Sequence, residues 1–125
     1  MTNPFVHVEL MATDVGKAKS FYGKLFDWEM EDTTVENLPT PDKTYTMIKV
    51  GEGTGGGLMR NPIPGEDSMW VAYVNVDNLK AATAKAKSLG ATVMKDQVVV
   101  EGRGSFSIIT DPTGAMLGLW QPKVG

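Results

Sequence analysis

The strongest constraint on the fold of this chain is an internal repeat with an offset of 63 residues. The segment Asp14-Val15-Gly16-Lys17-Ala18 aligns with Asp77-Asn78-Leu79-Lys80-Ala81 at this offset, and Gly57-Leu58-Met59 resembles Gly118-Leu119-Trp120 two residues out of step with it. Each copy has the pattern of a strand, a helix and three further strands. One copy alone would expose an open sheet edge and an unburied apolar face, so the repeat predicts two halves that pair.

The first copy is bounded by recognisable start and stop signals. Asp14 is a good N-cap for an amphipathic helix, because its carboxylate can accept from free amide groups of the first turn. Apolar residues then recur at helical spacing at Val15, Ala18, Phe21, Tyr22 and Leu25. Alternating or apolar runs predict strands at 5–12, 28–31, 44–50 and 58–59.

The second copy repeats this plan between two turn signals. Asp77 is the predicted N-cap of a helix that carries apolar residues as far as Leu89, with Gly90 at its C-terminal end. The residues 111–114, Asp-Pro-Thr-Gly, are a strong turn signal. Strands are predicted at 70–76, 91–94, 98–100, 105–110 and 115–121.

Length and composition indicate one globular domain. The 125 residues include no cysteine, carry a net charge of −3 and contain no apolar run near the ~20 residues of a membrane span. No basic face is available for nucleic acid, and no signal peptide is evident at the N-terminus. We therefore expect a cytoplasmic protein that binds neither nucleic acid nor membrane. The expected single domain is 1–125, with one module at 4–61, a linker at 62–68 and a second module at 69–122.

Motifs across nearly the whole chain resemble the vicinal-oxygen-chelate superfamily (glyoxalase, bleomycin resistance protein and extradiol dioxygenase). In the first half these are His7-Val8-Glu9-Leu10, Thr13-Asp14-Val15, Phe21-Tyr22-Gly23 and Trp28. In the second half they are Leu89-Gly90-Ala91, Asp111-Pro112-Thr113-Gly114 and Gly118-Leu119-Trp120-Gln121-Pro122. The resemblance implies a single-domain glyoxalase-like member with an α+β fold. In such a fold, two tandem βαβββ modules form a curved, mostly antiparallel sheet that encloses a cleft, with helices on the outer face.

The resemblance also implies four metal-ligand positions in metal-dependent members, of which this chain retains one. The first position matches His7, and its counterpart in the second half falls at Val71, or at Trp70 if the register slips by one. The last strand places Gly118 at a ligand position, and the first half places Gly57 there. A glycine at 118 would leave space where a ligand side chain stands, which favours a binding cavity.

A count of ligands leads to the same conclusion without any alignment. His7 is the only histidine, so one chain cannot supply the two imidazoles of a two-His-one-carboxylate iron site. We expect no cofactor and no ring-cleaving dioxygenase activity. A divalent metal held by His7 with carboxylates is the open alternative.

His7 and Glu9 are two residues apart on a predicted strand, so their side chains share one face. An imidazole beside a carboxylate can transfer protons near neutral pH. The alternative is that the two groups only bond to each other at a sheet rim.

An apolar, adaptable pocket is a further expectation from the methionine and aromatic residues. The predicted cleft residues are Met47, Val71, Tyr73, Met116, Gly118 and Trp120. Met59, Tyr45 and Trp70 are further members of the apolar set and are equally consistent with ordinary core.

Three functions follow from these observations. The first is a glyoxalase/bleomycin-resistance-like protein that binds a small organic molecule without the full metal site. The second is a glyoxalase-like lyase or isomerase in which His7 and Glu9 transfer protons, with or without metal. The third is a non-catalytic regulatory module. The resemblance implies a homodimer in each case.

Overall fold

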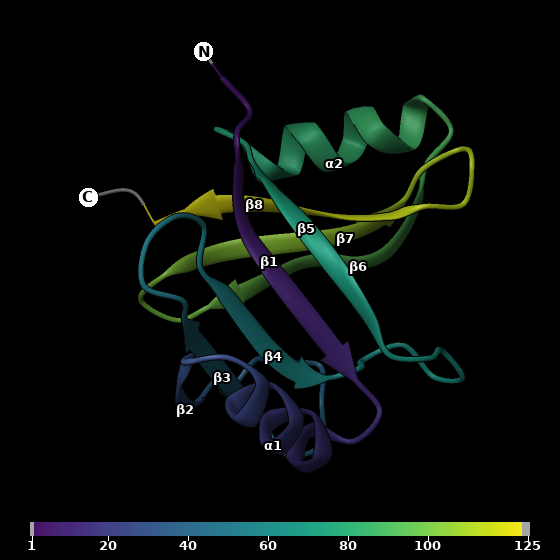
Figure 1. The fold of residues 1–125 in the computed structure, drawn as a ribbon. Helices are drawn as coiled ribbons and strands as arrows, with labels where there is room; N and C mark the ends of the chain where they lie inside the picture. The colour runs from purple at the N-terminus through teal and green to yellow at the C-terminus, as the bar shows by residue number, and fades with distance from the viewer. Residues whose placement is uncertain (1, 124–125) are drawn as a thin grey trace. The chain divides into compact units, whose positions relative to one another are not determined.

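A computed structural model describes residues 2–123, which divide into two compact units, His7–Val71 and the remainder. The fold is α+β and contains two βαβββ modules, which confirms the prediction from the repeat (Figure 1). Module 1 consists of β1 (Phe5–Ala12), α1 (Val15–Leu25), β2 (Glu29–Thr34), β3 (Thr44–Lys49) and β4 (Gly56–Arg60). Module 2 consists of β5 (Met69–Asn75), α2 (Leu79–Ser88), β6 (Thr92–Val100), β7 (Gly104–Thr110) and β8 (Met116–Pro122).

The strands follow the same order in both modules. In module 1 the order is β2-β3-β4-β1, and in module 2 it is β6-β7-β8-β5. The first and last strands of each module run parallel, whereas the other pairs are antiparallel hairpins. The prediction of mostly antiparallel pairing is therefore confirmed within each module.

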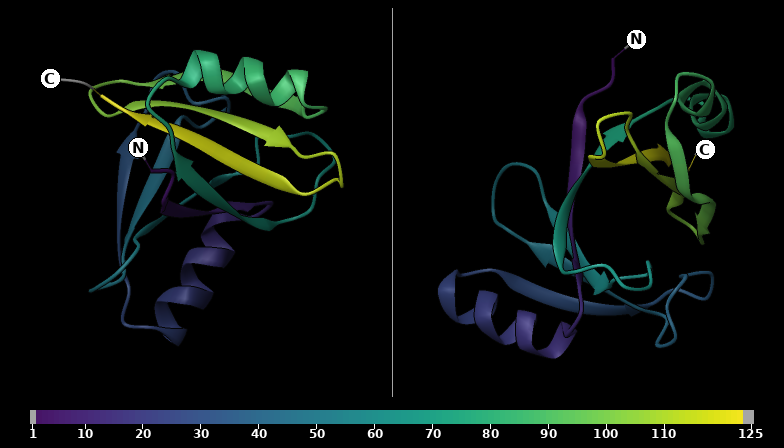
Figure 2. Two further views of the ribbon diagram at one scale, coloured as in Figure 1. Left: turned by 90° about the horizontal axis from the view of Figure 1, so that it is seen from above. Right: turned by 90° about the vertical axis from the view of Figure 1, so that its right-hand side faces the viewer.

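Each helix covers one face of its own module. Figure 2 shows α2 lying along the yellow and green strands of module 2, where it packs on β6, β7 and β8. Its core cluster consists of Val76, Leu79, Ile109 and Leu119, with alanines of α2 filling the gap. The cluster of module 1 contains Leu10, Ala12, Ile48 and Leu58. Within residues 2–123, no helix is long and apolar enough to cross a membrane.

The helix starts agree with the sequence in module 1 and differ from it in module 2. The side chain of Asp14 accepts a hydrogen bond from the Lys17 amide, as predicted. In module 2 the N-cap is Asn78, which accepts from the Ala81 amide, so the prediction of Asp77 is wrong. Both residue types cap well, and the extended backbone at position 78 decides between them.

The end of α2 and the strand that follows it, β6, also differ in detail from the prediction. The C-cap is Leu89, and Gly90 lies just beyond it with a positive φ of 101°. The segments predicted as two strands at 91–94 and 98–100 form one strand, β6, and its ladder with β7 continues through two register shifts between Val93 and Val98. Gln97 absorbs this irregularity with a φ of 49°.

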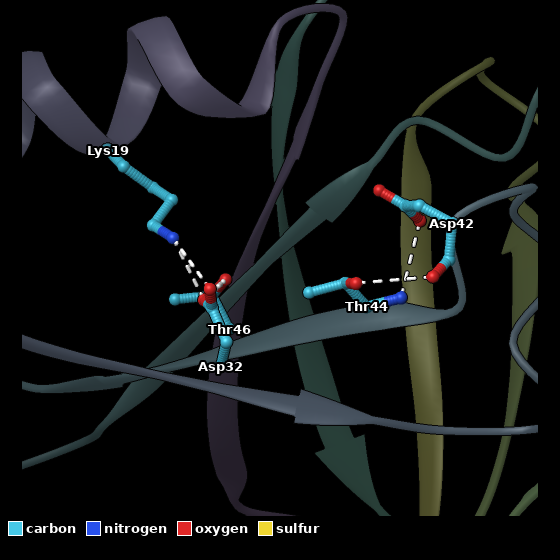
Figure 3. A network of polar contacts seen from close by, with 5 residues as sticks. All are labelled: Lys19, Asp32, Asp42, Thr44 and Thr46. Carbon is cyan, nitrogen blue, oxygen red and sulfur yellow. Dashed lines mark hydrogen bonds and ion pairs between the residues drawn. The ribbon is translucent and has the colours of Figure 1, made fainter.

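A polar network fastens α1 to the strands of module 1. The ammonium group of Lys19 donates to both carboxylate oxygens of Asp32 at 2.9 and 3.0 Å (Figure 3). The buried Thr46 hydroxyl donates to the same carboxylate at 2.6 Å. The Thr46 bond, more than the neighbouring ammonium, lowers the pKa of Asp32. The network therefore needs an ionised Asp32.

Candidate functional site

The candidate site lies on the face of module 1 that is opposite α1, here termed the helix-distal face of module 1. Strand alternation and register place there His7, Glu9, Met11, Tyr45, Met47, Gly57 and Met59. The other set of alternating side chains packs beneath α1. The predicted pair of His7 and Glu9 therefore does share a face, and Met47 lies on it as well.

A short hydrogen bond joins His7 to Tyr45. The His7 Nε2 atom lies 2.6 Å from the Tyr45 hydroxyl oxygen, and the two rings stack at 6.2 Å. In one tautomer the hydroxyl donates to Nε2, and in the other Nε2–H donates to the hydroxyl. Burial lowers the pKa of His7, so the imidazole is neutral at pH 7. The pair can accept or donate one hydrogen bond without carrying a net charge.

Glu9 is the acidic group of this face. It is 3 % exposed and faces Gly57 in the β1–β4 ladder. Among residues 2–123, no buried polar side-chain atom lacks a hydrogen-bond partner. The carboxyl group is therefore accommodated in the fold, and it adds a proton-binding group to the face that carries His7.

Tyrosine side chains occupy the space above both glycines that the resemblance assigns to metal-ligand positions. A Cβ atom at Gly57 would collide with the Tyr45 hydroxyl, and one at Gly118 would collide with the Tyr73 ring. The expectation that Gly118 leaves open space is therefore wrong. The tyrosine ring, delivered by the neighbouring strand β5, fills that space.

The corresponding face of module 2 is apolar. Tyr73 faces Gly118 in the β5–β8 ladder and packs edge-to-face on Phe106 at 5.9 Å. Ile108 lies beside Gly118 and is fully buried. Strand alternation places Met116 and Trp120 on the same face. Four of the predicted cleft residues thus lie together in module 2.

The ladders also decide which residue of module 2 corresponds to His7. Glu9 faces Gly57 in module 1, and Tyr73 faces Gly118 in module 2. The counterpart of His7, two residues before Glu9, is therefore Val71 rather than Trp70. Val71 is a buried aliphatic residue and offers no metal ligand.

These residues do not fit the metal of the metal-dependent members. Three of the four ligand positions hold Val71, Gly57 and Gly118, and tyrosine rings fill the space above both glycines. Within residues 2–123, no group of three or more His, Cys, Asp or Glu side chains is arranged to hold a metal ion. The polar groups that this face offers are an imidazole, a phenol and a carboxyl group.

Tyr45 is the functional candidate that the sequence did not single out. In the sequence Tyr45 is only one member of an apolar set, and its bond to His7 depends on β3 and β1 lying two strands apart. Alternation with Met47 on β3 is the one signal that could have placed Tyr45 on this face.

A separate groove of about 660 Å³ lies at one end of module 1. It is lined by Asp27, Glu29, Ile48, Lys49, Val50 and glycines of the β3–β4 loop. None of the predicted cleft residues lines it, so it is distinct from the face that carries His7.

Comparison with known proteins gives one family. The family model described as Glyoxalase/Bleomycin resistance protein/Dioxygenase superfamily matches residues 5–119. The proteins named "Putative glyoxylase CFP32" from Mycobacterium bovis and Mycobacterium tuberculosis are 34 % identical over 117 residues, which is 91 % of this chain. The chain spans only 44 % of the length of these relatives.

Solved structures share the fold at low sequence identity. A Bacillus halodurans protein, BH1468, has a TM-score of 0.66 at 16 % identity, with 100 % of this chain and 98 % of that one covered. Methylmalonyl-CoA epimerase from Mycobacterium tuberculosis has a TM-score of 0.67 at 14 % identity, with 96 % and 88 % covered. A Streptomyces coelicolor methylmalonyl-CoA epimerase variant, in complex with 2-nitronate-propionyl-CoA, has a TM-score of 0.71 at 12 % identity, with 99 % and 100 % covered. At these identities the likeness concerns the fold alone.

Proposed function

The chain belongs to the Glyoxalase/Bleomycin resistance protein/Dioxygenase superfamily, and we propose that it binds a small organic molecule on the helix-distal face of module 1. The observation that supports this proposal most is the half-buried His7–Tyr45 pair, which lies on a face that keeps only His7 among its metal-ligand positions. A scaffold that keeps polar groups on this face but cannot hold the metal is suited to recognising a ligand directly.

The His7–Tyr45 pair would orient the ligand by hydrogen bonding, and the neighbouring side chains would make apolar contacts with it. A neutral imidazole bonded to a phenol recognises a carbonyl, hydroxyl or amide group through one hydrogen bond. Met47 is half-buried on the same face, and its flexible thioether adapts to ligands of different shape. On the helix-distal face of module 2, taken by itself, we propose Val71, Tyr73, Met116 and Trp120 as ligand contacts, with Gly118 lying beneath the Tyr73 ring.

Proton transfer by His7 and Glu9 is the second candidate function. The buried Glu9 carboxyl favours it, because a carboxyl group held away from water beside an imidazole is a recurring arrangement for acid–base catalysis. The reaction would be that of a lyase or isomerase, in which one group removes a proton next to a carbonyl and the other returns it. With a single histidine in the chain, ring-cleaving dioxygenase chemistry is not proposed.

Methionine-methyl NMR tests the binding proposal at individual sites. The protein would be labelled with [methyl-¹³C]methionine and titrated with a fragment library of carboxylic acids, thioesters and phenols. We expect the Met47 methyl signal to shift and the signal of Met30, which packs beneath α1, to stay unchanged. A shift of the Met116 signal would report a ligand on the face of module 2. The shifts should weaken in His7→Ala and in Tyr45→Phe. The proposal would be contradicted if no compound moved a methionine signal. It would also be contradicted if the shifts in His7→Ala and in Tyr45→Phe were as large as those in the wild type.

Deuterium incorporation separates binding from catalysis. Methylmalonyl-CoA and the glutathione hemithioacetal of methylglyoxal each carry an acidic C–H next to a carbonyl, so ¹H NMR in D₂O detects proton exchange. Catalysis predicts exchange that falls by roughly tenfold or more in His7→Gln and in Glu9→Gln. Binding with no exchange above the uncatalysed rate would leave ligand binding as the function.

The homodimer and the cytoplasmic location belong to this proposal as well. Both follow from the sequence and from the family rather than from the geometry of one chain.

A further inference from the structure

Six large, mainly apolar side chains gather on the surface of the compact unit His7–Val71, from α1, the segment after it and the start of β5. This aromatic patch consists of Phe21, Tyr22, Leu25, Phe26, Trp28 and Trp70. Tyr22 lies at its centre, with ring centroids 4.9 Å from Phe21, 5.9 Å from Trp28 and 5.5 Å from Trp70. The Trp70 indole N–H donates to the Tyr22 hydroxyl at 3.4 Å, so the rings form one connected surface.

Most of this patch faces outward. Phe21 is 58 % exposed, Leu25 55 %, Phe26 44 % and Trp70 42 %, whereas Tyr22 and Trp28 are half-buried and anchor the patch to the core of module 1. No residue of α1 is fully buried. A contiguous group of exposed aromatic side chains is unusual on a monomer and is typical of the centre of a protein–protein interface.

Charges around the patch indicate what kind of partner it fits. Lys17 and Lys24 border it on α1, and Asp27 and Glu29 border it on the segment that follows. A nucleic acid or an anionic membrane would be attracted to the first pair and repelled by the second. A second copy related by a twofold axis can place the lysines of one chain against the acids of the other, since such an interface pairs a surface with itself.

The lengths of the curated relatives are consistent with a second copy of this chain as the partner. The matched segment is 44 % of each curated relative, so the rest of each relative is longer than this chain. Those proteins therefore have room within one polypeptide for a second module pair beside the first.

We propose that the aromatic patch is the contact surface through which two copies of this chain form a homodimer. The inference builds on the homodimer in the proposed function and is independent of the ligand. The hydrophobic centre would be the cluster around Tyr22, with Lys24 of one copy facing Asp27 of the other at the rim.

Sedimentation velocity over a range of protein concentrations tests this surface. We expect a dimer for the wild-type chain and a dissociation constant raised roughly tenfold or more in Phe21→Glu/Leu25→Glu. Both side chains are exposed, so the variant should keep its circular dichroism spectrum. Leu89→Glu is the matched control, because Leu89 is 69 % exposed on module 2, and this variant should remain dimeric.

A charge exchange tests the proposed orientation. Lys24→Glu should weaken the dimer, and Lys24→Glu/Asp27→Lys should restore it. A wild-type chain that stays monomeric at its highest soluble concentration overturns the proposal, as does a dimer that Phe21→Glu/Leu25→Glu leaves intact. Binding of a monomeric wild type to phosphatidylcholine–phosphatidylserine vesicles, lost in the same variant, would overturn it in favour of a membrane surface. The methionine-methyl titration, repeated on the Phe21→Glu/Leu25→Glu variant, reports ligand binding separately.

Discussion

The two modules have the same strand order but differ in the polar groups on their helix-distal faces. On the helix-distal face, module 1 carries His7, Tyr45 and a buried Glu9, whereas module 2 carries Tyr73 and the fully buried Ile108. On the helix side the contrast reverses in part. Module 2 buries a hydroxyl pair, Thr83 and Ser107, beneath an alanine-rich helix. Module 1 buries the Thr46 hydroxyl on this side, bonded to Asp32, and in addition carries exposed aromatic side chains on and beside its helix.

Equivalent positions show how far the copies have diverged. His7 corresponds to Val71 and Glu9 to Tyr73, while Gly57 and Gly118 stay glycine. The repeated backbone is thus retained, and acid–base groups remain in only one copy. In the proposed function, the acid–base groups His7 and Glu9 therefore both come from module 1.

Adding a methyl group at each glycine should separate the two modules most strongly. Gly118→Ala forces Cβ into the ring of Tyr73, which is buried against Phe106 and cannot swing away. Overpacking of this kind costs about 1–3 kcal/mol, and urea denaturation measures it. In Gly57→Ala the colliding group is the hydroxyl end of the half-buried Tyr45, which can rotate. We expect a smaller loss of stability there, but a broken His7–Tyr45 bond.

The His7 ring reports this difference. Its NMR signals should move in Gly57→Ala and stay unchanged in Gly118→Ala. Equal losses of stability in the two variants would show that Tyr45 is held as rigidly as Tyr73, and the comparison would fail.

Thr46→Val and Thr83→Val compare a charged with a neutral hydrogen bond. Thr46 donates to the Asp32 carboxylate, so its loss should cost about 1.5 kcal/mol, at the low end for a charged partner because Asp32 is half-exposed. The folded pKa of Asp32 is lowered, so this contribution is complete above the unfolded pKa of about 3.9 and disappears as the pH falls through the folded value. Urea denaturation from pH 7 to pH 3 should show the Thr46→Val deficit shrinking.

Thr83→Val provides the neutral reference in module 2. Its hydroxyl donates to the Leu79 carbonyl and bonds to Ser107, and we expect a loss of about 1 kcal/mol. No titrating group takes part, so the deficit should be the same at every pH in the series. If the stability deficit of Thr83→Val shrank in acid as well, the pH dependence of the Thr46→Val deficit could not be assigned to Asp32.

Helix capping should be the feature in which the modules agree. Asp14→Ala and Asn78→Ala each remove a side-chain acceptor from a first-turn amide and should each cost about 1 kcal/mol. Asp77→Ala, at the position that the repeat alone suggests, should change the stability by less than about 0.5 kcal/mol. Thermal unfolding of the three variants measures these differences. A larger loss in Asp77→Ala than in Asn78→Ala would place the helix start one residue earlier.

These cases show which features the sequence determines. The repeat and the turn residues were enough for the two modules, because hydrophobic period and capping are local properties. The cap at Asn78 was missed because Asp77 has the same chemistry one position earlier. The His7–Tyr45 bond and the Tyr73 ring above Gly118 could not be predicted. Both depend on which strands are neighbours and on their register, information that lies outside any single segment.

The smallest effect that we predict is the pH dependence of the free energy of unfolding near neutral pH. It arises from His7, and therefore from module 1 alone. Burial lowers the folded pKa of His7, so between that value and the unfolded pKa of about 6.5 the unfolded chain binds more protons. Stability should therefore be unaffected by His7 at pH 8 and should fall as the pH drops below about 6.5. His7 is the only histidine, and Val71 stands at its counterpart, so His7→Gln should abolish this slope. Denaturation of both proteins at pH 8, 6.5 and 5 measures the slope. If His7→Gln kept the wild-type slope, the imidazole would not be the buried neutral group on which the proposed site depends.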